Sequence, residues 1–341
     1  MHKTRSQTEN NGRFQAGGIV ALSVSHFIHD IYSGFLSPLL PLLIEKLSLS
    51  LTQAGFLSTV MQIPHLANPY IGILADRVSV RYFVILAPTL TAIPMSLIGV
   101  APTYGVLLIL LFVTGISVAV FHVPAPVMVA KLSGAQKGRG MSFFMTGGEL
   151  ARALSPLVAV GAVSLMGLEG FYPVMVVGFA TSLWLFFRFK DVPIGNTGKT
   201  PIALSRTWRK MKNILGPLAA ILTLRGFMHG AMTTFLPTFI KLETGNLWLA
   251  GIALTVFETA GVAGILVAGP LSDRFGRRRI LMASLVGAPL ALALLTWTGG
   301  WVRYAMMVAT GLTLLSTTPV MLAMIQEHAA ESPSSANGLF M

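Results

Sequence analysis

Three ionisable residues stand close together in an apolar stretch near the start of the chain. His26, His29 and Asp30 lie 8–12 residues into the segment 18–44, which is long enough to span a membrane as a helix. At 1.5 Å per residue this places them near the middle of a bilayer. His26 and Asp30 are four residues apart, so they share one helix face. A charge at that depth costs at least about 2.5–3.5 kcal/mol, so such residues usually have a function.

Other apolar segments carry polar residues at similar depth. Arg225 and His229 share a face of the segment 214–240 with Thr233, and Glu149 and Arg152 are three residues apart in the segment 141–166. Five of the seven histidines are predicted to lie inside the membrane, which apolar packing alone does not require. The residues predicted to line a substrate and proton pathway are His29, Asp30, His122, Glu149, Arg152, Arg225, His229 and Glu258.

These residue types suggest separate roles. Asp30 and Glu149 are candidate proton carriers, because burial disfavours the charged form of a carboxylate. Arg225, and with less support Arg152, would attract an anionic group on a substrate. Two alternatives remain open: Glu149 and Arg152 form an ion pair that only fixes packing, or Glu258 simply pairs with another helix.

Catalysis and metal binding find little support in the sequence. The motif His26-x-x-His29-Asp30 offers metal-ligand side chains, but three ligands on consecutive turns of one helix are geometrically awkward, and no second cluster is evident. The chain has no cysteine, which excludes disulfides and thiolate ligands. No nucleophile–base pair stands out either. We therefore predict no enzyme activity, no catalytic residue, no metal and no cofactor, with a proton gradient as the driving force.

Composition predicts an all-α membrane protein with many spans. Hydrophobic residues make up 54% of the 341 residues and charged residues only 11%, against about 25% charged in a soluble domain. The apolar segments are too long for barrel strands and do not alternate, and long segments satisfy their backbone in lipid only as helices. Ten spans are predicted near 18–44, 53–75, 83–101, 104–130, 141–166, 170–189, 214–240, 250–271, 280–298 and 302–325.

The net charge of +12 is distributed as a topology signal. With a cytoplasmic N-terminus, the inside segments hold 19 Lys and Arg residues and the outside loops hold 3, namely Lys46, Lys241 and Arg303. This asymmetry follows the positive-inside rule. It favours lipid, and not nucleic acid, as the partner of the basic residues. The first apolar run lacks a cleavage site and is expected to remain as an anchor.

The two parts of the chain repeat each other. The stretch from His26 to Leu36 aligns with 226–236 at an offset of 200, and 72–77 aligns with 269–274 at an offset of 197. Repeats in the same order predict two parallel bundles. The expected organisation is a cytoplasmic tail at 1–16, a six-helix bundle at 17–189, a cytoplasmic linker at 190–213 and a second bundle at 214–341.

The repeat also predicts that two spans are missing from the second bundle. The end of the chain, 336–341, matches the opening of the fifth span, 138–145. We therefore expect twelve spans in the complete protein, and this chain to be a fragment or a truncated product.

Two loops carry a family signature. Gly72-x-Leu74-x-Asp76-Arg77 follows the second span, and Gly269-x-Leu271-x-Asp273-Arg274-x-Gly276-Arg277-Arg278 follows the eighth. Both resemble the signature loop of the major facilitator superfamily; the first copy departs from it at Ser79 and Val80. An aspartate at a helix end can pair with nearby arginines, and this pairing can act as a conformational latch that holds one arrangement of the two halves. The alternative is that the arginines only fix the orientation of the spans in the membrane. The predicted latch residues are Gly72, Asp76, Arg77, Arg81, Gly269, Asp273, Arg274, Gly276, Arg277 and Arg278.

Within that superfamily, the first and fifth spans look like those of the fosmidomycin-resistance type of bacterial drug exporter. The resemblance rests on His26-Phe27-Ile28-His29-Asp30 and on 148–156. It implies a monomeric carrier in a bacterial inner membrane, whose first, fourth, seventh and tenth spans surround a central cavity. His29, Asp30, His122, Arg225 and His229 would then face one volume. The implied function is proton-coupled export of a small polar or anionic organic compound; the alternative is proton-linked uptake of an organic anion.

Overall fold

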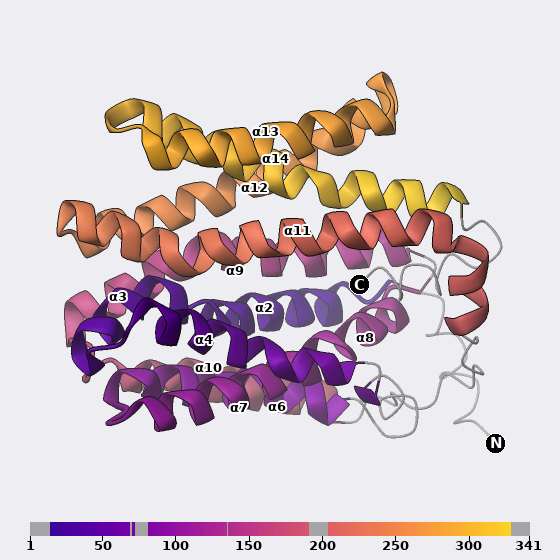
Figure 1. The fold of residues 1–341 in the computed structure, drawn as a ribbon. Coiled ribbons are helices and arrows are strands. Elements are labelled where there is room, and N and C mark those ends of the chain that lie inside the picture. Colours follow the sequence, from indigo (N-terminus) through magenta and orange to yellow (C-terminus); the bar gives the residue numbers. More distant parts are fainter. Residues whose placement is uncertain (1–13, 69, 72–80, 135, 191–203, 329–341) are drawn as a thin grey trace, which may run out of the picture. The chain divides into compact units, whose positions relative to one another are not determined.

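Helices are the only regular elements in the part of the chain that the structure describes (Figure 1). The computed structural model describes residues 14–68, 70–71, 81–134, 136–190 and 204–328. These residues form two compact units: one holds the described residues up to 190 together with 241–251, and the other holds residues 204–240 and 252–328. The predicted all-α class is confirmed.

The first unit contains helices that are interrupted where the sequence weakens them. A break between α2 and α3 falls at Gly34 and Phe35, just before Pro38, and a second break between α7 and α8 falls at Val123 and Pro124. Proline lacks the amide hydrogen that a helix interior needs, so helices kink or restart near it. The elements are α2 (Ala16–Ser33), α3 (Leu36–Leu47), α4 (Leu51–Gln62), η2 (Ile63–Ala67), α6 (Arg81–Leu97), η3 (Ile98–Val100), α7 (Tyr104–His122), α8 (Ala125–Leu132), α9 (Lys137–Met166), η4 (Tyr172–Val174) and α10 (Met175–Phe189).

Helix α2 lies at the centre of the packing in this unit. It contacts α9 along much of its length and also packs against α6 and α10, while α6 packs against α7. The buried cluster around it includes Ile19, Leu22, Phe121 and Phe144. Burying such side chains contributes roughly 1.5–3 kcal/mol each relative to water. The position of α2 explains how its polar residues reach neighbours from several helices.

The described part of the second unit contains four helices. They are α11 (Leu204–Thr244), α12 (Leu247–Phe275), α13 (Arg277–Trp297) and α14 (Gly300–His328). Helix α11 ends, and α12 begins, with residues that belong to the first unit. Helix α13 packs along α14, where the hydroxyls of Ser284 and Ser316 lie 2.7 Å apart in a buried hydrogen bond. Helix α11 begins at Leu204, so the last part of the predicted linker is helical.

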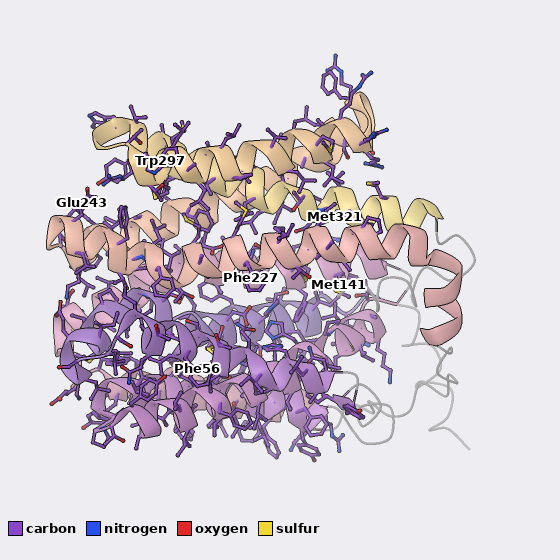
Figure 2. All side chains as sticks on the ribbon, viewed as in Figure 1. Phe56, Met141, Phe227, Glu243, Trp297 and Met321 are labelled. Carbon is purple, nitrogen blue, oxygen red and sulfur yellow. The ribbon has the colours of Figure 1, made fainter. Side chains whose placement is uncertain are left out.

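Many apolar side chains point outward from the helices (Figure 2). Trp297 and Phe227, both labelled in that view, are 84% and 74% exposed. Exposed apolar surface on this scale is rare in soluble proteins and is expected where lipid is the solvent.

Among the described residues, eight helical stretches are long and apolar enough to cross a membrane, and they confirm eight of the ten predicted spans. Of the other two segments, 53–75 starts within α4 and continues through η2. Its last residues lie outside the described ranges. The segment 214–240 lies inside α11 and is helical throughout. The eight stretches are Ala16–Leu47, Arg81–Val100, Tyr104–Leu132, Arg139–Met166, Tyr172–Phe189, Leu247–Phe275, Arg277–Trp297 and Gly300–Met321.

The second signature loop forms a tight turn between α12 and α13. Gly276 adopts a φ of +94°, which side chains rarely tolerate. Across the turn, Arg277 pairs with Asp273 at 2.6 Å and donates to the hydroxyl of Ser272 at 2.5 Å. The guanidinium of Arg274 lies over the ring of Phe275.

The first signature loop is only partly described. Gly72, Asp76 and Arg77 lie outside the described ranges. Arg81 begins α6, with its guanidinium over the ring of Tyr82.

Candidate functional site

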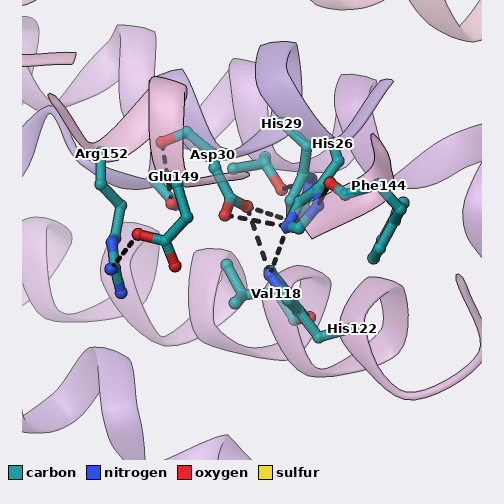
Figure 3. Close-up of polar contacts among 10 residues, drawn as sticks. His26, His29, Asp30, Val118, His122, Phe144, Glu149 and Arg152 are labelled. Carbon is teal, nitrogen blue, oxygen red and sulfur yellow. Dashed lines mark hydrogen bonds and ion pairs between the residues drawn. The ribbon is translucent and has the colours of Figure 1, made fainter. Parts of the chain in front are cut away.

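Four of the polar residues inside the first unit form one cluster (Figure 3). Helix α2 supplies His26, His29 and Asp30, and the last residue of α7 supplies His122. The Asp30 carboxylate lies 3.2 Å from Nε2 of His26, 3.4 Å from Nε2 of His122 and 4.0 Å from Nε2 of His29. The two nitrogens Nε2 of His26 and His122 are 3.3 Å apart. A carboxylate and three imidazoles therefore converge at one point.

The hydrogen-bond partners of Nδ1, the ring nitrogen that faces away from Asp30, fix the tautomers of His26 and His122. Nδ1 of His26 lies 2.8 Å from the carbonyl oxygen of Phe144, and Nδ1 of His122 lies 3.0 Å from that of Val118. A carbonyl oxygen only accepts, so each Nδ1 must carry the hydrogen. In its neutral form each ring therefore presents a bare Nε2 lone pair to Asp30.

A chain of hydroxyls orients the third histidine in the same way. Ser117 donates to the carbonyl oxygen of Ala87 at 3.2 Å, and Thr91 donates to the hydroxyl of Ser117 at 2.8 Å. Each hydroxyl has a single hydrogen, so the Thr91 oxygen must accept from Nδ1 of His29, 3.1 Å away. Nε2 of His29 is buried without a hydrogen-bond partner among the described residues, and it too faces Asp30.

The cluster is therefore made of acceptors alone when the histidines are neutral. An ionised Asp30 and three Nε2 lone pairs would face each other without a hydrogen between them. Buried polar groups in that state are strongly unfavourable. A positive charge, carried by a proton or another cation, is required to hold the arrangement together. This is the central chemical property of the site.

Aromatic side chains hold the rings in place. The ring of His29 stacks on Phe121 with centroids 4.3 Å apart, and the ring of His26 stacks on Phe144 at 4.1 Å. Both phenylalanines are fully buried. Packed neighbours of this kind restrict each ring to one orientation, which keeps the nitrogens directed at Asp30.

A glycine on α9 makes room for the ring of His26. A Cβ added at Gly148 would lie 2.5 Å from Cε1 and 2.6 Å from Nε2 of His26. We predict that Gly148→Ala pushes the ring away from Asp30 and destabilises the protein by about 1–3 kcal/mol, as overpacking does. Thermal unfolding in detergent and transport by reconstituted protein would measure both effects. Gly105→Ala on α7 is the matched control, because the nearest atom to its added carbon lies 4.0 Å away; equal behaviour of the two variants would contradict the prediction.

Glu149 and Arg152 form a second polar feature in this unit. Arg152 donates to the Glu149 carboxylate at 2.5 Å, and both residues lie on α9, three positions apart. The two side chains are partly exposed, at 24% and 38%. Glu149 and Arg152 thus form an ion pair within α9.

The second unit contains two further polar pairs. Nε2 of His229 on α11 lies 3.5 Å from the carboxylate of Glu258 on α12, which is buried. One turn before His229, Arg225 donates a hydrogen bond to the hydroxyl of Thr318 on α14. Glu258 thus pairs with another helix, and a carboxylate–imidazole pair occurs in this unit as well as in the first.

The structure joins some predicted site residues and adds others. It brings His122 to His29 and Asp30, and it pairs His229 with Glu258. That both sets face one shared volume stays a prediction. The sequence did not identify Thr91 and Ser117 as site residues. Their position as hydroxyl residues inside apolar segments could have indicated a polar contact there. The backbone carbonyl groups that accept from the histidines could not be predicted from the sequence, since every residue has a carbonyl group.

Comparisons with known proteins agree with this architecture. Residues 22–341 match the family described as the Major Facilitator Superfamily. The fosmidomycin resistance protein of Escherichia coli (strain K12) is 25% identical over 96% of this chain and 82% of its own length. A probable sulfoacetate transporter of Cupriavidus necator is 22% identical over 88% of this chain and 77% of its own length.

A solved structure shows the same fold. The bacterial homologue of the human lysosomal transporter Spinster superposes with a TM-score of 0.80 at 16% identity, over 96% of this chain and 79% of the other. The family match covers nearly all of the sequence, and the helices, the signature loop and the charged residues inside the membrane fit it. The chain belongs to the major facilitator superfamily, and is a multi-pass membrane transporter and not an enzyme.

Proposed function

We propose that this transporter exchanges protons for a small polar or anionic organic compound and exports that compound by alternating access. The observation that carries the proposal is a carboxylate–imidazole pair inside each unit: Asp30 with His26 at 3.2 Å, and Glu258 with His229 at 3.5 Å. Such pairs can take up and release a proton where lipid would not tolerate a fixed charge. Asp30 and Glu149 remain the proposed carriers in the first unit.

Cationic side chains support an anionic or polar substrate. Arg225 holds its guanidinium near mid-span in α11, bonded to Thr318, and Arg152 lies on α9 beside Glu149. A guanidinium binds carboxylate, sulfonate and phosphonate groups through paired hydrogen bonds. The relatives named for fosmidomycin resistance and for sulfoacetate transport are consistent with export and with organic anions, respectively.

The experiment is a proton-flux assay in vesicles. The full-length protein is reconstituted with a pH-sensitive dye in the lumen, and phosphonates, organic acids and antibiotics are added outside in turn. Exchange moves protons out as substrate enters, so the lumen becomes more alkaline. Uptake by symport moves both inward and makes the lumen more acidic, which would establish the alternative. A substrate that accumulates with no proton movement would refute coupling.

We also propose that the second signature loop is a conformational latch near the cytoplasmic face. Its support is the ion pair between Asp273 and Arg277 and the turn at Gly276. An ion pair at this exposed position contributes only about 0–1 kcal/mol to stability. We therefore expect Asp273→Asn to slow the transport cycle while thermal unfolding stays unchanged. Transport rates at saturating substrate would measure this, and an unchanged rate would favour the topology-anchor alternative.

A further inference from the structure

We propose that His26, Asp30 and His122 form a binding site for a divalent transition-metal ion of the zinc class. This goes beyond proton coupling and does not depend on it. Each residue offers one ligand atom, and these three atoms lie within 4.8 Å of one another. The ligands come from two helices, α2 and α7, that are far apart in the sequence.

The spacing of the ligand atoms fits tetrahedral coordination. A zinc ion bound at about 2.0–2.1 Å holds neighbouring tetrahedral ligand atoms about 3.3 Å apart. The three separations here are 3.3 Å between the two nitrogens Nε2, 3.2 Å from His26 to Asp30 and 3.4 Å from His122 to Asp30. The two histidines face different oxygens of the carboxylate, so a small rotation of Asp30 would bring one oxygen to the ion. The three atoms then form one face of the coordination tetrahedron.

The hydrogen bonds behind the ligands also match a metal site. Histidines that bind a metal through one nitrogen almost always donate a hydrogen bond from the other nitrogen to a carbonyl or a carboxylate. His26 does so to Phe144, and His122 does so to Val118. Both rings are thereby held in the tautomer whose Nε2 lone pair is available. No rearrangement of tautomers is needed before an ion binds.

The charge of the cluster and the exposure of His122 also suit a metal ion. A divalent cation would supply the positive charge that this set of acceptors lacks. Two imidazoles and a carboxylate suit zinc and neighbouring first-row ions, and the chain has no cysteine to favour softer ones. The His122 side chain is 35% exposed, whereas that of His26 is only 5% exposed, so His122 is the more accessible of the two imidazole ligands. The fourth coordination position would be filled by water.

A ligand from a second helix removes the geometric difficulty of binding a metal on α2 alone. Neighbouring turns of α2 alone give awkward geometry, and the sequence does not show that His122 reaches Asp30. With a ligand from α7, an ion would join two helices of the first unit. We therefore expect bound zinc to hold the two helices together and to inhibit transport.

The test is metal titration of the purified full-length protein after removal of any affinity tag. Cobalt is the probe, because four-coordinate Co²⁺ gives strong visible absorption that six-coordinate, surface-bound Co²⁺ does not. We expect saturable binding of a single Co²⁺ per chain with a four-coordinate spectrum, and its displacement by Zn²⁺. No saturable binding, or only a six-coordinate spectrum, would overturn the proposal. Because the assay involves no transport, its outcome is independent of whether the protein moves protons.

Substitutions locate the ion. His122→Gln, at a partly exposed helix end, should weaken Co²⁺ binding at least about 100-fold, since loss of even an outer partner costs 10–100-fold. His26→Gln should do the same, and if it fails to fold the His122 variant carries the test alone. His229→Gln is the matched control in the other unit and should bind as wild type does. Unchanged binding by His122→Gln, or loss of binding in His229→Gln, would place the ion elsewhere and refute this site.

Discussion

Replacing Asp30 with asparagine is expected to reduce substrate-driven proton movement to the level of empty vesicles while the protein stays folded. An amide carries no titratable proton, so the cluster loses its negative charge. Its NH₂ group, however, can donate a hydrogen bond to the bare nitrogen of His26 or of His122, which lie 3.2 and 3.4 Å from different oxygens of the present carboxylate. The asparagine side chain thereby offers the neutral cluster one donor without a cation. The measurement is luminal pH on addition of substrate, beside thermal unfolding in detergent.

Two further variants make this result interpretable. Glu258→Gln removes the other buried carboxylate beside an imidazole, and Glu149→Gln removes the carboxylate that is already paired with Arg152. If only the Asp30 and Glu258 variants lose coupling, the Glu149–Arg152 pair serves packing. If Asp30→Asn keeps wild-type coupling, Asp30 is not a proton carrier. Should Asp30→Asn unfold, loss of coupling in folded His122→Gln would still implicate the cluster.

The sequence predicted the membrane helices and the residues inside them because lipid imposes simple constraints. An apolar run of about 20 residues must be helical, and a histidine or aspartate within it is costly. Spacing along α2 also placed His26 and Asp30 on one face, as the structure confirms.

Contacts between helices could not be derived in the same way. His122 follows Asp30 by 92 residues, and only the family expectation suggested that the first and fourth spans meet. The tautomers depend on the carbonyl groups of Phe144 and Val118, which carry no sequence signature. Thr318 is one of several hydroxyl residues near the end of α14, and nothing in its neighbourhood singles it out as the partner of Arg225. Helix register and rotation, which decide such pairs, arise from packing of the whole bundle.

Substitution of Arg225 is expected to lower the affinity for an anionic substrate. Arg225→Leu removes a partly buried guanidinium that is held by Thr318, and we expect the apparent affinity for an anionic substrate to fall about 10- to 100-fold, the equivalent of one hydrogen bond to a charged group. Uncharged substrates should lose far less, because they lack the group that the guanidinium binds. The measurement is competition for binding in detergent across substrates that differ in charge.

The matched variants separate charge from geometry. Arg225→Lys keeps the positive charge but loses the planar pair of donors, so it should recover only part of the affinity. Thr318→Val removes the hydroxyl that orients the guanidinium while leaving the charge in place, and should cause a smaller loss than Arg225→Leu. If Arg225→Leu weakens charged and uncharged substrates equally, the residue supports the fold of the second unit and does not select anions. If Arg225→Lys binds as wild type does, a single point charge suffices, and the hydrogen bond to Thr318 does not contribute to anion recognition.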